Sequence, residues 1–375
     1  MDSRQGITRG VTVRRCAFRN ASLWRSVGLV VAVFLALGCR VQRPPPGQPQ
    51  GVVAVTNPRT DSEWDYVSDQ PWDRSGRWVY FTRSSLEIGS RVWRLDVRTG
   101  REQPIIFDAF GVLVNPARDE MAFVTRRAGI VVSDLQGRGR RELARPAGET
   151  IAWDPRGTRL ARLERGTPRW RRLIVMIDPH TGEAHPLAET AAFWPSLTWT
   201  SNMTRVAYIE WPDRGRGFKG TLTLFTLKPR HTDIVQGIWL SPEGHDGMSW
   251  SQERMSLAVA AHRDGSPGTR LHAQRIFLVD VTTRKASPVT VGRFDYQPDW
   301  SPDGNRIAFT RHVGGTSQLN TIAPDGSDPS VLVRAFGTLG HPSWSPSGKF
   351  IAVCHHEPGT KQGPLRSRVI ILSPP

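Results

Sequence analysis

The sequence predicts an all-β fold made of repeated antiparallel units, and three observations carry that prediction. Glycine and proline number 35 and 29 among 375 residues, which is a turn-dense composition. Tryptophan is abundant, with 14 copies. Six of them recur at similar long intervals, at Trp72, Trp153, Trp199, Trp250, Trp300 and Trp344. The length suits two average domains or one large all-β domain.

The clearest unit of the repeat begins at Trp300, which is followed by Ser-Pro-Asp-Gly and a run of β-formers at 306–310. Pro302 presets φ for a turn, Asp303 can bond its own backbone, and Gly304 tolerates a positive φ. We therefore expect a tight hairpin between two strands. A single hairpin is marginal in water and must pack against something else.

Copies of this hairpin follow one another along the chain. The gaps from Trp153 onward are 46, 51, 50 and 44 residues, and the 81 residues between Trp72 and Trp153 leave room for a copy with Val114 in place of the tryptophan. Eight residues after each anchor stands a small or aromatic residue: Tyr80, Ala122, Ala161, Ala207, Ala258, Ala308 and Ala352. The register is unbroken in all seven units.

Each unit continues into a third strand, which usually ends near an aspartate or another turn residue. These strands are expected at 92–96, 130–134, 173–178, 222–226, 276–280, 319–322 and 369–372. A short fourth strand follows, for example at 289–291 and 331–333. Four antiparallel strands with a period of about 40 to 50 residues are typical of a β-propeller blade.

Seven units predict seven blades, and the last lacks a fourth strand of its own. The apolar run 51–56 has no other partner, so we expect the N-terminal strand to complete the final blade and remove the open edges. Six blades remain an alternative if the Val114 unit is absorbed into a neighbour.

The repeats resemble the WD-like propeller units of TolB and its relatives, whose pattern runs Trp-Ser-Pro-Asp-Gly-x-x-Ile-Ala-Phe. Residues 300–309 match it throughout and 344–352 nearly so, whereas Trp153 and Trp72 begin partial matches. The resemblance covers roughly 64–372 and implies a propeller. It does not carry over a role in Tol translocation.

Residues 1–39 are expected to be an export segment rather than part of the fold. Six arginines precede an uncharged stretch at 26–38 that is too short to cross a bilayer comfortably. The stretch ends in Ala-Leu-Gly-Cys39, which resembles a bacterial lipobox and implies lipidation of Cys39. A plain secretory signal and an uncleaved anchor are the alternatives. Residues 40–51 form a Pro-rich tether, and 52–375 a single propeller domain.

The net charge of +16 comes mostly from arginines spread along the chain. A solvated basic surface is the simplest interpretation, with an anionic partner as the alternative. No nucleic-acid-binding motif occurs, so no nucleic acid is expected as a partner. The cysteines, Cys16, Cys39 and Cys354, imply no disulfide framework. Cys354 is expected to be buried on a second strand.

No catalytic motif is found: there is no Gly-x-Ser-x-Gly elbow, no His-Glu-x-x-His and no phosphate-binding loop. Neither a metal site nor a cofactor is expected, since His355 and His356 are adjacent on a strand and point to opposite faces. The aspartates that end third strands are interpreted as turn residues.

The unbroken register does place some polar residues at equivalent heights. Twelve residues after the anchors stand His262, His312, His356, Arg126, Arg165, Trp211 and Ser84. Three residues before the anchors, on the same expected face, stand Asp69, Thr150, Ser196, Gln297 and His341. They are interpreted either as solvent-facing loop residues or as a rim that binds a partner.

The predicted function is that of a non-enzymatic lipoprotein of the cell envelope, in the periplasm or at the outer membrane. Its propeller is expected to be a monomer and to bind a protein, a glycan or another anionic ligand on one face. Two alternatives remain. One is an enzyme of the polysaccharide-lyase type that uses ring-face histidines, and the other is a purely structural envelope component.

Overall fold

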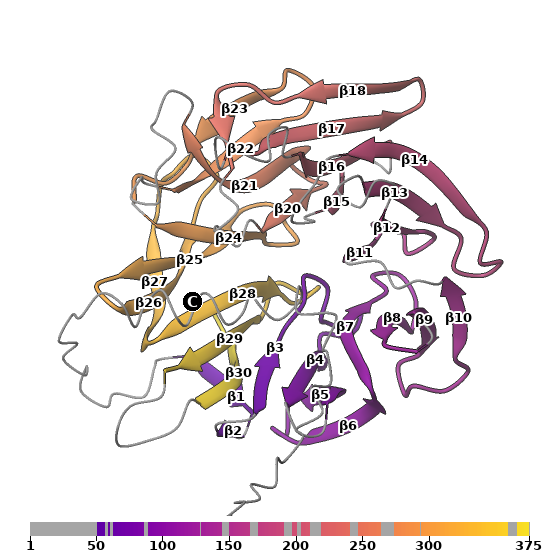
Figure 1. Ribbon diagram of the computed structural model, residues 1–375. Helices are drawn as coiled ribbons and strands as arrows, with labels where there is room; N and C mark the ends of the chain where they lie inside the picture. The colour runs from indigo at the N-terminus through magenta and orange to yellow at the C-terminus, as the bar shows by residue number, and fades with distance from the viewer. Residues whose placement is uncertain are drawn as a thin grey trace, which may run out of the picture. The chain divides into compact units, whose positions relative to one another are not determined.

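Each anchored repeat forms one antiparallel sheet, and seven sheets follow one another as the blades of a β-propeller (Figure 1). The structure is a computed structural model that describes residues 51–56, 59–60, 63–85, 89–127, 129–144, 150–165, 172–190, 197–200, 204–210, 219–240, 247–263, 274–292, 294–358 and 366–374. The expected export segment, Cys39 and nearly all of the tether lie outside these residues. Within the described ranges, no helix is long and apolar enough to cross a membrane.

The strands of the first four blades run in chain order from the inside of the ring outward. They are β3 (Glu63–Tyr66), β4 (Trp78–Ser85), β5 (Gly89–Asp96) and β6 (Glu102–Phe107); β7 (Ala109–Val114), β8 (Glu120–Thr125), β9 (Gly129–Asp134) and β10 (Arg141–Ala144); β11 (Thr150–Trp153), β12 (Leu160–Arg165), β13 (Arg172–Ile177) and β14 (Ala184–Thr190); β15 (Leu197–Thr200), β16 (Arg205–Glu210), β17 (Thr221–Leu227) and β18 (Arg230–Ile234).

The last three blades follow the same plan. They are β19 (Ile238–Trp239) with β20 (Met248–Ser251), β21 (Ser256–Arg263), β22 (Arg275–Asp280) and β23 (Lys285–Pro288); β24 (Asp295–Trp300), β25 (Ile307–Val313), β26 (Thr316–Ile322) and β27 (Ser330–Phe336); β28 (Thr338–Trp344), β29 (Ile351–Glu357) and β30 (Arg366–Leu372), completed by β1 (Val52–Val55) and β2 (Arg59–Thr60). The prediction of seven blades is confirmed. The six-blade alternative is wrong, because Val114 ends an inner strand as the tryptophans do.

The N-terminal strand closes the ring, as predicted. In β1, Val52 pairs with Leu372 and Val55 with Ile370 of β30. Just beyond β1, the Thr56 N–H donates to the carbonyl of Val369 at 2.9 Å. The edge of the last blade is therefore covered by a strand from the other end of the sequence.

The hairpins have the predicted turn chemistry. Gly304 has a φ of 66°, and Asp303 accepts the N–H of Asn305 at 3.1 Å. The structure adds a contribution from the residue directly after most anchors. The Ser301 hydroxyl, for example, accepts the N–H of Arg306 at 2.9 Å across the turn. Buried Asp73, Asn115, Asp154 and Ser345 accept turn N–H groups in the same way.

The third strands lie where they were predicted, and their terminal aspartates form turns. Asp96 and Asp280, for example, accept the N–H groups of Arg98 and Thr282, respectively, two residues on. In the fifth blade, the prediction of a fourth strand at 289–291 was wrong. The fourth strand of this blade is β23, which ends at Pro288. Val289 still donates to the carbonyl of Ile276, but there the chain is leaving the sheet toward the next blade.

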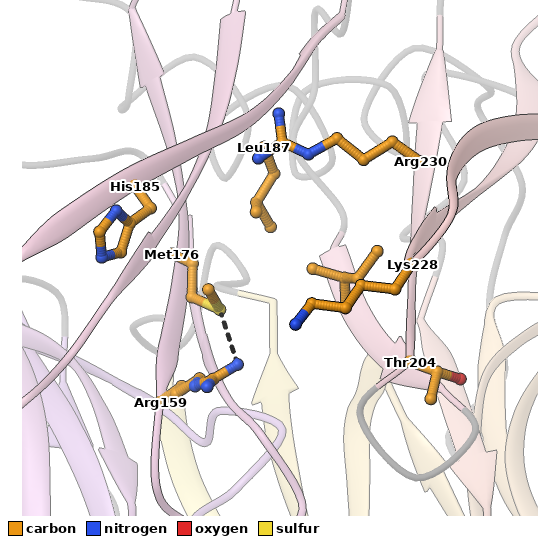
Figure 2. Close-up of a pocket in the computed structure, with 8 residues that line it drawn as sticks. Arg159, Met176, His185, Leu187, Thr204, Lys228 and Arg230 are labelled. Atoms are coloured by element: carbon orange, nitrogen blue, oxygen red, sulfur yellow. Dashed lines mark hydrogen bonds between the residues drawn. The ribbon is translucent and has the colours of Figure 1, made fainter.

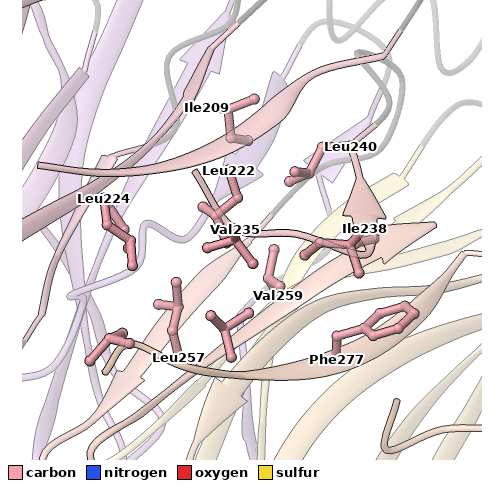
Figure 3. Packing of buried hydrophobic residues seen from close by; sticks show 13 residues of the cluster. Ile209, Leu222, Leu224, Val235, Ile238, Leu240, Leu257, Val259 and Phe277 are labelled. Carbon is pink, nitrogen blue, oxygen red and sulfur yellow. The ribbon is translucent and has the colours of Figure 1, made fainter. Parts of the chain in front are cut away.

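The core consists of apolar layers between neighbouring blades. Figure 3 shows one such layer, in which Ile209 and Leu222 of the fourth blade face Val259 and Phe277 of the fifth. The anchors contribute to these layers, as predicted: Trp72, Trp153, Trp199, Trp300 and Trp344 are buried. Trp250 is an exception, since it is only half-buried and its indole bonds Gln252 within its own turn.

Several anchors also bond across the blade boundary. The indole N–H of Trp72 donates to the Ser343 carbonyl at 3.0 Å, and that of Trp153 to the Leu113 carbonyl at 3.2 Å. In both cases the acceptor is the residue just before the preceding anchor. The tryptophan therefore fixes the height of one blade against the next while its ring fills the gap between them.

A buried ion network lies where the first and last blades meet. Asp65 on β3 accepts two hydrogen bonds from Arg83 on β4, at 2.7 and 2.9 Å, and Arg83 also bonds Glu102 at 2.9 Å. From the last blade, Thr56 donates its hydroxyl to Asp65 at 3.1 Å, and Ser367 accepts the Asp65 N–H at 2.7 Å. These charges are compensated on several sides, as burial requires.

Thr56→Val should destabilise the fold although it preserves side-chain volume. The hydroxyl accepts the N–H of Val369 at 2.8 Å and donates to Asp65, so its loss leaves the Val369 N–H unsatisfied and removes one hydrogen bond from the buried carboxylate. The expected loss in the free energy of unfolding is about 1–3 kcal/mol. Chemical denaturation measures it, with exposed Thr99→Val as the control; equal stabilities of the two variants would contradict the role of Thr56 at the closure.

Candidate functional site

The candidate site lies on the innermost strands, around the axis of the ring. In three blades the inner strand contains an irregularity at the same point of the repeat, between Phe110 and Leu113, Tyr296 and Asp299, and Gly340 and Ser343. The residue three before the anchor has a left-handed backbone there: Gly111 at 62°, Gln297 at 52° and His341 at 53°. A bulge of this kind redirects a side chain out of the alternation of the strand.

Gln297 and His341 use this geometry to reach each other across two blades. The Gln297 side-chain oxygen accepts the backbone N–H of His341 at 2.8 Å, and its Nε2 lies 3.3 Å from Nε2 of His341. A left-handed backbone at a residue other than glycine is strained. Two such residues at equivalent positions and in contact mark this part of the ring as a candidate site.

Tyr66 and Asp69 bring the first blade to the same place. The rings of Tyr66 and His341 meet edge to face, with centroids 4.6 Å apart. Tyr66 is 37% exposed and Asp69 is also exposed, so water reaches both side chains although Tyr66 ends the inner strand β3. Protein nevertheless surrounds Asp69, and the resulting desolvation raises its pKa.

Asp299 completes what we call the axial cluster: Tyr66, Asp69, Gln297, Asp299 and His341. Its carboxylate accepts the Ser249 hydroxyl at 2.9 Å and the backbone N–H of Trp344 at 2.8 Å, so it bridges three blades. Desolvation, with a smaller contribution from the negative charge of Asp69, raises its pKa to about 7 against these hydrogen bonds.

Two glycines leave space for Gln297. A Cβ on Gly247 would lie 2.9 Å from the Gln297 Cα, which is closer than real contacts allow. A Cβ on Gly340 would lie 3.3 Å from the Gln297 side-chain oxygen. Small residues at these two positions are therefore a condition for the bulge.

The three histidines predicted twelve residues after the anchors lie at the ends of second strands, each packed inside its own blade. His262 is buried and stacks on Trp239, with centroids 4.0 Å apart. His312 meets Tyr296 edge to face at 5.1 Å. His356 is hydrogen-bonded through Nδ1 to the Ser367 hydroxyl at 3.0 Å. Their local contacts are those of packed residues.

Of the other predicted rim residues, the structure describes the side chains of Arg126 and Ser84. Arg126 is exposed in a turn, and Ser84 is buried against Ser90 at 2.9 Å. Thr150 begins β11 and Arg165 ends β12, but their side chains lie outside the described residues, as do Trp211 and Ser196 entirely. Of the predicted residues, the structure thus brings together Gln297 and His341, with Asp69 nearby.

Sequence reasoning missed Tyr66 and Asp299. Asp299 stands directly before an anchor, in a position that elsewhere holds residues such as Ser249 and Ser343, so a comparison at that position could have found it. Tyr66 offered no such signal, because it precedes Trp72 by six residues outside the shared register. Its side chain is placed by the closure of the ring.

The axial cluster consists of hydrogen-bond acceptors and donors with one aromatic ring, and it is suited to binding. The carboxylates, the amide and the imidazole can all accept from N–H or O–H groups. Among the described residues, no three His, Cys, Asp or Glu side chains are grouped as a metal site requires. Cys354 is buried on β29, as predicted, and accepts the N–H of Val67 at 2.9 Å.

The fold defines a β-propeller protein, and comparisons with known structures agree. An oligogalacturonate lyase in complex with manganese matches with a TM-score of 0.64 at 14% identity, over 87% of this chain and 98% of the other. The β-propeller domain of the Trilobed protease of Pyrococcus furiosus matches with a TM-score of 0.61 at 10% identity, over 82% and 95%. At these identities the likeness concerns the fold.

At the level of sequence, the chain is similar to the Tol-Pal system protein TolB of Nitrosomonas europaea. The two are 31% identical over 64 residues, which is 17% of this chain and 15% of that protein. The predicted resemblance to TolB is confirmed at this length. No protein-family model matches the chain.

Asp299 should make stability depend on pH. Its pKa is about 7 in the folded protein against 3.8 for an ordinary aspartate. Between these two pH values the carboxyl group therefore holds a proton in the folded state that it has lost in the unfolded state. The stability this group contributes is full below about pH 4 and is lost as pH rises to about 7, on the order of 2–4 kcal/mol in all.

Comparison with Asp299→Asn isolates this group, because the amide does not ionise. The free energy of unfolding of the wild type minus that of the variant should fall between pH 4 and pH 8, measured by urea denaturation. A difference that stays flat or rises with pH would mean that the carboxylate is ionised normally in the folded protein.

Proposed function

We propose that the protein is a non-enzymatic binding protein of the cell envelope whose propeller holds a partner at the axial cluster. The observation that carries this proposal is the contact between Gln297 and His341, made by two strained backbones in adjacent blades. Strain of this kind persists where the surrounding structure enforces it, and it is frequent at binding sites.

The chemistry of the cluster favours a partner that donates hydrogen bonds. Asp69 and Asp299 repel anionic groups when ionised, whereas glycan hydroxyls and peptide N–H groups would find acceptors and the ring of Tyr66 beside them. A protein or glycan segment suits these groups better than an anionic ligand. The scattered arginines then serve as a solvated basic surface.

Photo-crosslinking in intact cells tests the proposal. A photoreactive phenylalanine analogue at position 66 should capture a discrete partner, and Gln297→Ala with His341→Ala should lower the yield about five-fold or more, since these side chains form the cluster. The analogue at Phe107, which is 61% exposed on an outer strand, is the control. Sensitivity of the product to proteases or glycosidases tells protein from glycan.

Equal yields from positions 66 and 107, or a yield that the double variant leaves unchanged, would remove the axial cluster from the function. Thermal melting of the double variant checks that it is folded.

An envelope location rests on the lipobox-like end of the export segment and is supported by the similarity to TolB. A lipid on Cys39 followed by a Pro-rich spacer would hold the propeller away from a membrane surface.

Cys39→Ser should release the protein from the membrane fraction, because it removes the thiol that would carry the lipid. Cell fractionation with immunodetection measures the distribution, and Cys16→Ser, upstream of the expected cleavage point, is the control. Lipidation would be refuted if the variant stayed in the membrane fraction and mass spectrometry of the wild-type protein showed no modification of Cys39.

The lyase alternative has its support in the manganese-bound lyase that shares the fold. It is distinguished by metal analysis of the purified protein: a stoichiometric transition metal together with cleavage of an acidic polysaccharide would favour it. A purely structural role is distinguished by the crosslinking experiment, since it predicts no axial partner.

A further inference from the structure

A basic cleft lies between the third and fourth blades, away from the axial cluster. It has a volume of about 350 Å³ and is bounded on one side by β13 and β14 and on the other by the turn that joins β17 to β18 (Figure 2). A volume of this size is in the range of small-ligand sites. Nothing in the proposed function uses it.

Three cationic side chains border the cleft. Arg159 lies directly before β12, Lys228 lies in the turn that joins β17 to β18, and Arg230 begins β18. Figure 2 shows the Lys228 ammonium pointing into the space between the two walls. None of the three forms an ion pair with a described residue; Arg159 contacts the Met176 sulfur at 3.5 Å.

No carboxylate is among the residues that line the cleft, and two carboxylates close by have other contacts. Asp178 accepts the N–H groups of its own turn, from His180 at 2.7 Å and Thr181 at 3.1 Å. Glu183 lies 3.3 Å from the Nε2 atom of His185. Arg159 also attracts the Asp178 carboxylate and lowers its pKa, so this cation is partly compensated. The lining itself holds cationic side chains and no acidic one, and it would attract an anion in the cleft.

The wall behind the cations is apolar. Leu187 is buried, and Met176 and Leu227 are half-buried at the same cleft. Figure 2 shows Arg230 extending across Leu187. Such a wall adds affinity for a ligand that carries hydrocarbon next to its charge.

We propose that this cleft binds a phosphate group attached to an apolar chain. Two guanidinium groups and an ammonium group match the several oxygens of a phosphate better than the two of a carboxylate. The apolar chain would lie against Leu187, Met176 and Leu227. A lipid headgroup and a soluble phosphoester are two sources of this chemistry. The site does not depend on the axial cluster.

Isothermal titration calorimetry of the full-length protein tests the proposal with inorganic phosphate and hexyl phosphate as probes. Hexyl phosphate should bind about three- to tenfold more tightly, because part of its chain is buried. The triple variant R159Q/K228Q/R230Q should lose at least about tenfold in affinity for both probes. The control R98Q/R334Q/K349Q removes the same charge from exposed positions elsewhere and should stay within about twofold of the wild type.

A second arm identifies the source of the phosphate. Full-length protein with Cys39→Ser in every sample, so that no lipid anchor contributes, is sedimented with vesicles of phosphatidylglycerol or phosphatidylcholine. If the protein binds phosphatidylglycerol vesicles but not phosphatidylcholine vesicles, and the triple variant loses this binding, the ligand is a lipid headgroup. If it binds hexyl phosphate but neither kind of vesicle, the ligand is a soluble phosphoester. Wild-type affinity in the triple variant, or an equal loss in the charge-matched control, would overturn the site.

Discussion

Each blade of a propeller has two apolar faces that only its neighbours can bury, so the fold depends on closure of the ring. Here the closing contact joins β1 to β30, and a buried network of Thr56, Asp65, Arg83 and Ser367 ties the last blade to the first. Apolar packing alone would tolerate small slips between blades. The directional bonds of Thr56 and Ser367 to Asp65 do not, because any slip leaves buried polar groups without their partners.

The same closure determines the candidate site. Tyr66 belongs to the first blade and His341 to the last, and they meet only because the ring is complete. Between blades five, six and seven, Ser249, Asp299 and Trp344 form a second bonded chain around the axis. Binding at the axis and stability of the ring thus share side chains. A mutation there acts on both, so the two effects have to be measured separately.

The axial cluster and the basic cleft differ in the way they are built. The cluster depends on strained backbone at Gln297 and His341, which the neighbouring Gly247 permits. The cleft depends on cationic side chains around an apolar wall, with no acidic residue in its lining. A propeller can carry both because its inner strands and its outer turns vary independently of the layers between the blades.

The sequence by itself determined the propeller fold, the hairpins and most of the buried anchors, because these follow from local turn chemistry and a recurrent spacing of tryptophan. It favoured seven blades, and the structure excluded six. The same spacing placed Gln297 and His341 at equivalent heights. It also suggested a rim of His262, His312 and His356, whose contacts within their own blades a register cannot show. Only the tertiary structure decided that Tyr66 and Asp299 join the axial cluster. Their proximity arises from packing between blades far apart in the chain, and burial there, rather than residue type, raises the pKa of Asp299.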